Sequence, residues 1–263
     1  MRRSIPLRLL LPCALALAIA APARAQEDTL TALGILLRAA EHIPARGSLS
    51  FSHRYGDVLR PVHLEIGPGR WALHGPPVRE GSLDLSFADI IVYFPGMVRD
   101  ERTGADLLTR LPDGTWDGHP VHVVSAVGSR AENRVIFHID RETFLVRGAR
   151  VPIPHGRGRG ATMELTFREY DEVEGFPVAR AREMTIAGIL DGRSVTAQEL
   201  GLAVRMARLQ RERATTDEER ARLDEMLWFL ERLDGEGTLR LRSEVVDVRA
   251  NGRRPAGFVR IGP

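Results

Sequence analysis

The sequence predicts a mainly β fold of the α+β class, in which an antiparallel sheet follows an N-terminal helix and accommodates an inserted helical block. Three observations predict it. Apolar and polar residues alternate with period two over many short segments, the pattern of half-buried strands. Turn residues rather than helices separate most of these segments, which favours a meander over a parallel α/β core. Helical periodicity is confined to two segments, residues 28–43 and 200–233.

Residues 28–43 are expected to form the first helix. Apolar residues recur there at helical spacing: Leu30, Leu33, Leu37 and Ala40. Asp28 can accept a hydrogen bond from the first turn, and Pro44 ends the pattern.

The alternating segments predict the strands of the sheet. They lie at residues 48–52, 62–66, 71–73, 83–87, 90–94, 120–127, 133–139, 143–151, 161–170, 177–190, 193–199, 237–249 and 257–261. Tight turns are expected at pairs of residues that tolerate positive φ, namely Asp113-Gly114, Asp117-Gly118, Asp191-Gly192 and Asn251-Gly252.

The helical block at 200–233 carries two apolar stripes, one around Met206 and one around Leu227. Thr216 and Glu219 resemble a capping box between the stripes, which indicates two helices or one broken helix. Strand periodicity resumes near Thr238, so the block is interpreted as an insertion at about 200–235 within a single domain, residues 26–263.

The N-terminus has the three parts of a secretory signal peptide over residues 1–25. Arginines precede an apolar run from Leu9 to Ala21, and Ala23-Arg24-Ala25 predicts cleavage after Ala25. The run is shorter than the roughly 20 apolar residues of a membrane span. An uncleaved anchor, a twin-arginine signal at Arg2-Arg3 and acylation at Cys13 are alternatives to general secretion. Cleavage predicts a periplasmic protein without a thiol.

Charge and composition exclude several kinds of function. Without the four arginines of the signal, 33 basic residues face 35 acidic ones, a net charge of −2 that gives no reason to expect nucleic-acid binding. The sequence contains no lysine, which excludes a Schiff-base or P-loop lysine.

Three segments are similar to motifs of the LolA-like proteins, the outer-membrane lipoprotein-sorting superfamily that includes LolA, LolB and RseB. Residues 115–124 (TWDGHPVHVV) resemble one strand motif of that family, and residues 137–147 (FHIDRETFLVR) resemble its hairpin motif. Residues 167–177 (FREYDEVEGFP) resemble its strand-turn-strand motif. The resemblance covers roughly residues 28–200; the block at 200–233 departs from the carrier proteins of the family.

The resemblance implies a strongly curved sheet that forms an incomplete barrel, with helices over an apolar concave face that holds acyl chains. It transfers no functional residue. A concave face of this kind predicts a ligand cavity and a lid formed from Phe51, Leu64, Trp71, Phe87, Phe137, Phe167, Met226, Leu227 and Leu230.

Residues capable of chemistry have simpler structural interpretations. His119 and His122 are three apart on a strand and point to opposite faces, while His53, His63 and His74 are not expected to lie opposite one another, so no metal site is predicted. A second set also has a structural reading: residues 155–160 suggest a hairpin loop rather than an anion-binding nest, and Asp140 is expected to bond its own backbone. No nucleophile or metalloprotease motif occurs.

These observations predict a secreted, non-enzymatic periplasmic protein that requires no cofactor and shelters a lipid or a lipidated partner in its half-barrel. The alternative is an envelope sensing or scaffold module that binds another protein through the helices at 200–233. In that case the apolar stripe of residues 223–233 is a docking face rather than a lid.

Overall fold

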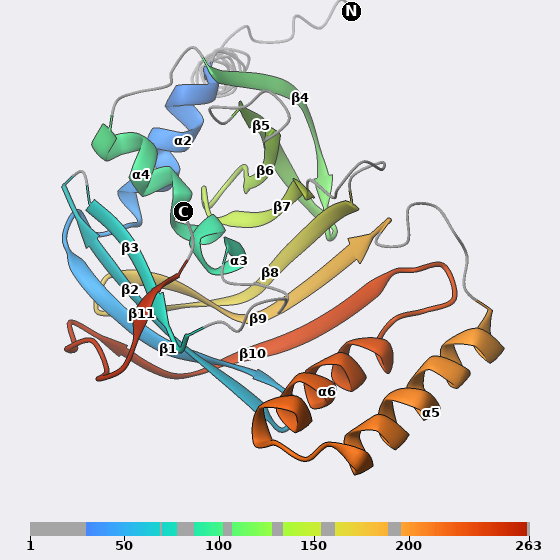
Figure 1. Cartoon of the computed structure of the whole chain (residues 1–263). Helices are drawn as coiled ribbons and strands as arrows, with labels where there is room; N and C mark the ends of the chain where they lie inside the picture. The colour runs from blue at the N-terminus through green and yellow to red at the C-terminus, as the bar shows by residue number, and fades with distance from the viewer. Residues whose placement is uncertain are drawn as a thin grey trace, which may run out of the picture.

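The computed structural model describes residues 30–68, 70–77, 87–101, 107–127, 134–153, 161–188 and 196–261. Within these ranges one sheet of 11 strands runs in the order β11-β3-β2-β1-β10-β9-β8-β7-β6-β5-β4, and neighbouring strands are antiparallel (Figure 1). The strands are β1 (Gly47–Tyr55), β2 (Val58–Gly67), β3 (Arg70–Gly75), β4 (Leu108–Trp116), β5 (His119–Val127), β6 (Arg134–Asp140), β7 (Val146–Ile153), β8 (Ala161–Val173), β9 (Phe176–Ala187), β10 (Leu239–Ala250) and β11 (Val259–Ile261).

Two meanders meet through the C-terminal part of the chain. Strands β1–β3 form one and β4–β9 the other, and β10 pairs with both β1 and β9. The short β11 then adds to the free edge of β3. The sheet is therefore open, with β11 and β4 at its edges.

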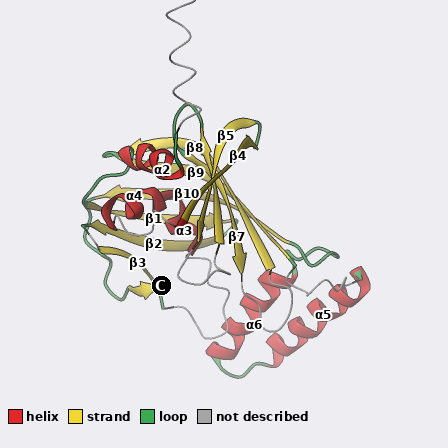
Figure 2. Ribbon diagram, turned by 90° about the horizontal axis from the view of Figure 1, so that it is seen from above, coloured by secondary structure: helices red, strands yellow, loops and turns green. Residues whose placement is uncertain are grey.

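The sheet curls around a hollow, as two views show (Figures 1 and 2). Register shifts interrupt the pairing between Ser50 and Ser52 and between Leu111 and Gly114, and bulges of this kind bend and twist strands. Asp247 has a left-handed φ of 55° inside the long strand β10. The half-barrel that the resemblance implies is confirmed.

Four helical segments lie inside this curl (Figure 2). They are α2 (Ala32–Glu41), α3 (Phe87–Ile90), the 3₁₀ turn η2 (Ile91–Tyr93) and α4 (Phe94–Glu101). The helix α2 is capped by Thr31, whose side chain accepts from the Gly34 amide; the predicted cap, Asp28, lies outside the described residues.

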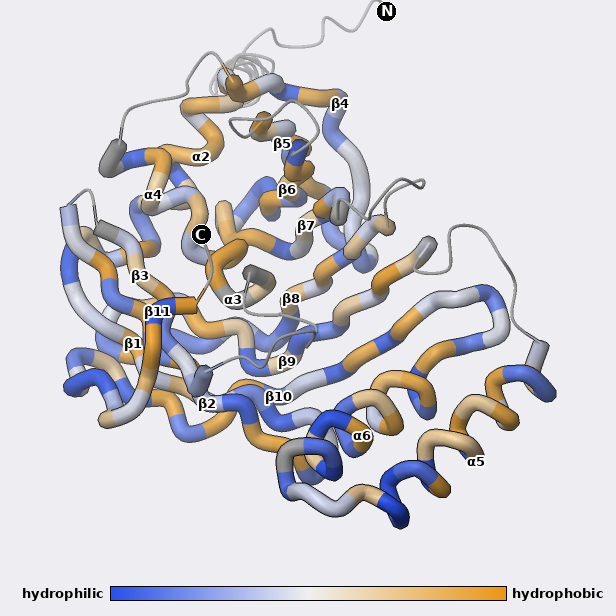
Figure 3. The backbone as a smooth tube through the Cα atoms, viewed as in Figure 1, coloured by the Kyte–Doolittle hydropathy of each residue, from blue (hydrophilic) through white to orange (hydrophobic). Residues whose placement is uncertain are grey.

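Alternation decides which face of each strand enters the core. Along β1 the residues Leu49, Phe51, His53 and Tyr55 are buried, while the residues between them are more exposed. The same alternation is visible as changing hydropathy along β10 (Figure 3). The concave face packs against the inner helices in one hydrophobic core.

Two predicted strands are wrong. Residues 90–94 are helical, and their prediction as strand failed because a fully apolar run looks the same in a buried helix and in a buried strand. Of the preceding segment, 83–86 lie outside the described residues and Phe87 begins α3. Residues 197–199 belong to α5 rather than to a strand at 193–199.

The turn predictions had mixed outcomes. Asp117-Gly118 forms the β4–β5 turn with positive φ at both residues, as predicted. Asp113-Gly114 lies instead within the unpredicted strand β4, at its register shift. Asn251 has a φ of 54° where the chain leaves β10, and Asp191-Gly192 lies outside the described residues.

The helical insertion is confirmed as a pair, α5 (Ala197–Arg213) and α6 (Asp217–Leu230). Thr216 caps α6 by accepting from the Glu219 amide, as expected, and Thr196 forms a complete capping box with Glu199 that the sequence reading missed. The pair packs together outside the curl, beside β10 (Figures 1 and 2).

Residues 1–25, the predicted signal peptide, lie outside the described residues. Among the helices that the structure describes, none is long and apolar enough to cross a membrane.

Candidate functional site

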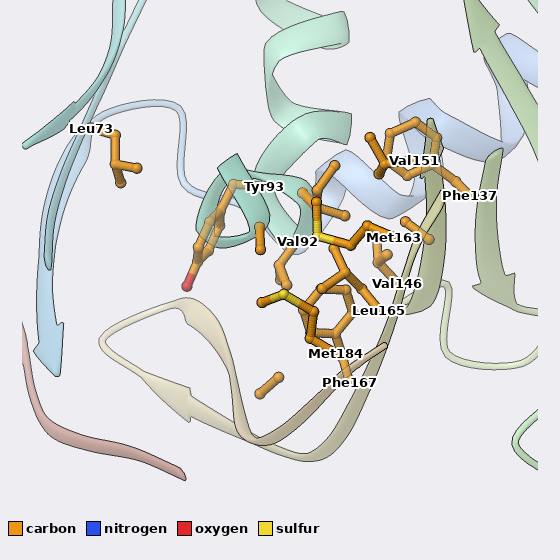
Figure 4. Packing of buried hydrophobic residues seen from close by; sticks show 14 of the residues in the cluster. Leu73, Val92, Tyr93, Phe137, Val146, Val151, Met163, Leu165, Phe167 and Met184 are labelled. Carbon is orange, nitrogen blue, oxygen red and sulfur yellow. The ribbon is translucent and has the colours of Figure 1, made fainter. Parts of the chain in front are cut away.

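The hollow of the half-barrel is covered by the segment 87–101, which we call the cover. Ala88, Ile91 and Val92 of the cover are buried against the sheet. Figure 4 shows Val92 and Tyr93 on the side of the hollow that faces Leu165 and Phe167 of β8. Because most of these contacts are between apolar side chains, the cover is stabilised by burial rather than by specific bonds.

A few polar and aromatic contacts fix the position of the cover. The ring of Phe94 stacks on that of Phe137, with 4.6 Å between centroids. The hydroxyl of Tyr93 donates to the carbonyl of Pro177 at 3.1 Å. Gly96 approaches Trp71 so closely that a Cβ there would lie 2.9 Å from the indole ring.

Arg99 ties the cover to the end of α2. Its Nη1 donates to the carbonyls of Ala40 at 3.0 Å and Ile43 at 2.7 Å, and its Nη2 lies 3.4 Å from that of Pro44. The last carbonyls of a helix have no partner within the helix, and a cation there also suits the helix dipole. This side chain is therefore the principal polar fastening of the cover.

A small cavity remains between the cover and the sheet. About 20 Å³ of it is accessible, roughly the space of one water molecule. Its walls come from the cover and from β1, β8, β9 and β10: Phe51, His53, Ala88, Val92, Tyr93, Phe167, Val178, Ala179, Arg182 and Val245. The hollow is thus almost filled by the protein's own side chains while the cover is in place.

Polar groups gather on one part of this cavity wall. Arg182 is 5% exposed, and its Nη2 donates to the hydroxyl of Tyr55 at 2.6 Å. His53 is 3% exposed, with Nδ1 3.4 Å from Oγ of Ser243. These side chains come from β1, β10 and β9, three adjacent strands. Trp228 of α6 contacts the same group, with its ring centroid 6.2 Å from that of Tyr55.

The predicted cavity residues divide into two groups. Phe51, Leu64, Trp71, Phe137 and Phe167 are buried in the core, and Phe51 and Phe167 line the cavity. The side chain of Phe87 lies outside what the structure describes.

The residues predicted for the lid lie on α6, away from the cover. Leu227 is buried, Leu230 is half-buried and Met226 is 39% exposed. The cover itself, and Arg182, were missed by the sequence reading. The charge of Arg182 hid its place on the same face of β9 as Met184 and Ile186.

The prediction that His63 and His74 do not face each other is wrong. They are direct partners across β2 and β3, with ring centroids 6.1 Å apart, and Nε2 of each lies about 3.5 Å from the Glu65 carboxylate. Arg254 lies 3.2 Å from Nδ1 of His74. Burial lowers the pKa of His63. Across the described ranges no group of side chains is arranged to hold a metal ion.

The other candidate residues have structural surroundings. Asp140 accepts from the amides of Glu142 and Thr143, as expected, and from Arg147. Burial alone would raise the pKa of Asp140, but these hydrogen bonds outweigh it and lower the pKa. His119 is exposed and His122 buried, on opposite faces of β5. The loop at 155–160 lies outside the described residues.

The fold and the site together define a half-barrel binding domain: an open, curved antiparallel sheet with helices in its hollow and a small cavity beneath them. This is the architecture that the LolA-like resemblance predicts.

Two solved structures are similar to this chain in fold. A DUF1329 family protein from Desulfovibrio piger has a TM-score of 0.39 at 12% identity, over 87% of this chain and 92% of that one. A domain described as part of an outer membrane lipoprotein-sorting protein from Vibrio parahaemolyticus has a TM-score of 0.41 at 10% identity, over 86% of this chain and 94% of that one. No family model matches the chain, and neither does any curated protein.

Proposed function

We propose that this protein is a non-enzymatic periplasmic binding protein that shelters an acyl chain, free or attached to a partner, in the hollow of its half-barrel. The cover, residues 87–101, moves aside to admit the chain. The observation that carries the proposal is the concave face itself, which is apolar on many strands and is closed by a helical segment held mainly by side-chain packing.

The free energies of the two states support exchange between cover and ligand. An acyl chain of about fourteen methylenes gains roughly 10 kcal/mol on burial. Moving the cover exposes side chains such as Ile91, Val92 and Tyr93, each worth about 1.5–3 kcal/mol when buried. The two terms are of similar size, so a ligand can replace the cover and leave again.

Binding of a fluorescent fatty acid to the purified protein tests this proposal, together with extraction of co-purified lipid. Replacing Arg99 with glutamine removes the cation that holds the cover to α2, so uptake is expected to be several-fold faster than in the wild type. The matched control is Arg46→Gln, an exposed arginine just before β1, where uptake is expected to be unchanged.

Two results would contradict the proposal. One is protein that contains no lipid and takes up no fatty acid. The other is fatty-acid binding at the same rate in the wild type, Arg99→Gln and Arg46→Gln, which would place the ligand somewhere other than beneath the cover.

A second candidate function is docking of another protein on α5. Leu202, Met206 and Leu209 are spaced along one side of this helix and are 53%, 50% and 47% exposed. Apolar residues at this spacing are typical of helix-in-groove recognition. Changing all three to serine is then expected to abolish capture of an envelope partner while fatty-acid uptake persists. Unchanged capture would exclude this face.

A further inference from the structure

We infer that the ligand of the hollow carries an anionic head group, carboxylate or phosphate, which binds to Arg182. This inference rests on the proposed function and specifies its ligand class. Arg182 is a charged side chain on the wall of an otherwise largely apolar cavity, inside the concave face rather than at its rim.

The strands fix where this guanidinium lies. Arg182 pairs with Phe167 of β8 on one side and with Ser243 of β10 on the other, so it occupies the middle of the sheet. The alternation of β9 places it on the same face as Met184 and Ile186, which are core residues. Its bond to the Tyr55 hydroxyl, at 2.6 Å, holds the side chain against β1.

The chemistry of arginine determines what this position recognises. A guanidinium stays charged at any physiological pH and presents five N–H donors in a planar fork that matches carboxylate and phosphate oxygens. Hydrogen bonds between ionised partners are about twice as strong as neutral ones, and low-dielectric surroundings strengthen them further. The hydroxyls of Tyr55 and Ser243 lie beside the same position and can donate to a second oxygen of the head group.

The rest of the cavity wall suits the apolar part of the same ligand. Phe51, Val92 and Phe167 line the cavity beside the cover. A molecule with one anionic end and an aliphatic chain therefore satisfies both parts of the wall at once. A neutral amphiphile of the same length satisfies only the apolar part.

Palmitate, hexadecyl phosphate and hexadecanol test the inference, because they share a chain of sixteen carbons and differ at the head. Their dissociation constants for the purified wild-type protein are measured by titration calorimetry. We expect the preferred anion to bind at least ten-fold more tightly than hexadecanol. The comparison of palmitate with hexadecyl phosphate tells whether the head is a carboxylate or a phosphate.

Two variants separate recognition from a purely structural role of Arg182. Arg182→Met keeps the length of the side chain and removes its charge, so the anion and hexadecanol are expected to bind within two-fold of each other. Tyr55→Phe removes the hydroxyl bond to Arg182 and keeps the charge, so most of the preference is expected to remain. A structural arginine would change stability in both variants without changing this ratio of affinities.

The wild-type measurement decides the matter even if Arg182→Met does not fold. Equal binding of all three amphiphiles by the wild type would overturn the inference and leave acyl-chain binding intact. Binding of none of them would overturn both.

Discussion

Replacing Gly148 with alanine is expected to destabilise the protein by about 3 kcal/mol, through overpacking between three strands. Gly148 lies in β7, where it pairs with His138 of β6 and Thr166 of β8. A Cβ built there would lie 2.2 Å from Nε1 of Trp116 and 2.5 Å from the carbonyl oxygen of Leu165. Neither distance is compatible with ordinary van der Waals contact.

Neither neighbour of Gly148 can move away easily. The Leu165 carbonyl belongs to the backbone of β8, so its displacement would break the pairing of β7 with β8. The indole of Trp116 donates to Oγ1 of Thr166 at 3.2 Å and stacks on His138, with 3.9 Å between ring centroids. The added methyl group must therefore bend β7, and strand curvature in this half of the sheet would change with it.

Chemical denaturation of Gly148→Ala and of a matched variant, Gly114→Ala, measures this effect. Gly114 also lies in a strand, β4, but the nearest atom to its Cβ would be Cγ2 of Val123 at 3.9 Å, an ordinary contact. Gly114→Ala is expected to be neutral or to stabilise by up to about 1 kcal/mol, since alanine restricts the unfolded chain. Equal free energies of unfolding for the two variants would show that the sheet yields at Gly148.

Much of the sheet was predictable from the sequence because half-buried strands leave a period-two pattern. Strand β10, for example, alternates Leu239, Leu241, Ser243 and Val245 on its buried face. The cover was not predictable in this way. Residues 90–94 are apolar without interruption, and only their position inside the curled sheet, a tertiary feature, makes them helical rather than extended.

The two errors at polar residues have different physical origins. The histidine pair was missed through a register error of one residue: the predicted turn began at Gly67, whereas Gly67 pairs with Arg70, which brings His63 opposite His74. Arg182 was missed because charged residues are almost never fully buried without a partner. Its neighbours in alternation, Met184 and Ile186, were the signal that it faces the core.

The stability of the protein is expected to fall by about 2 kcal/mol between pH 7.5 and pH 4.5 through His138 alone. Burial lowers the pKa of His138 to about 4, and the nearby Arg150 lowers it further while Glu164 opposes the shift. In the unfolded chain the same imidazole has its ordinary pKa of 6.5. As the pH falls below 6.5 the unfolded state binds a proton that the folded state refuses until about pH 4, so folding becomes less favourable across this window.

Replacing His138 with phenylalanine isolates this contribution. Both ring nitrogens of His138 are buried without a hydrogen-bond partner among the described residues, so a ring that cannot titrate loses no bond and can keep the stack on Trp116. Urea denaturation of both proteins at pH 7.5 and pH 4.5 gives the four free energies required. The wild type is expected to lose about 2 kcal/mol more than His138→Phe between the two pH values.

The comparison between the two proteins matters more than the slope of either one. Burial also lowers the pKa of His63, so some loss of stability below pH 6.5 remains in His138→Phe. Carboxylates such as Asp113 and Asp140, whose pKa values are lowered by their hydrogen bonds against the effect of burial, add a further loss at lower pH in both proteins. Identical losses in the two proteins would mean that His138 is hydrated in solution and that the Trp116 stack opens. Since that stack is also what resists the methyl group of Gly148→Ala, a small effect at one position requires a small effect at the other.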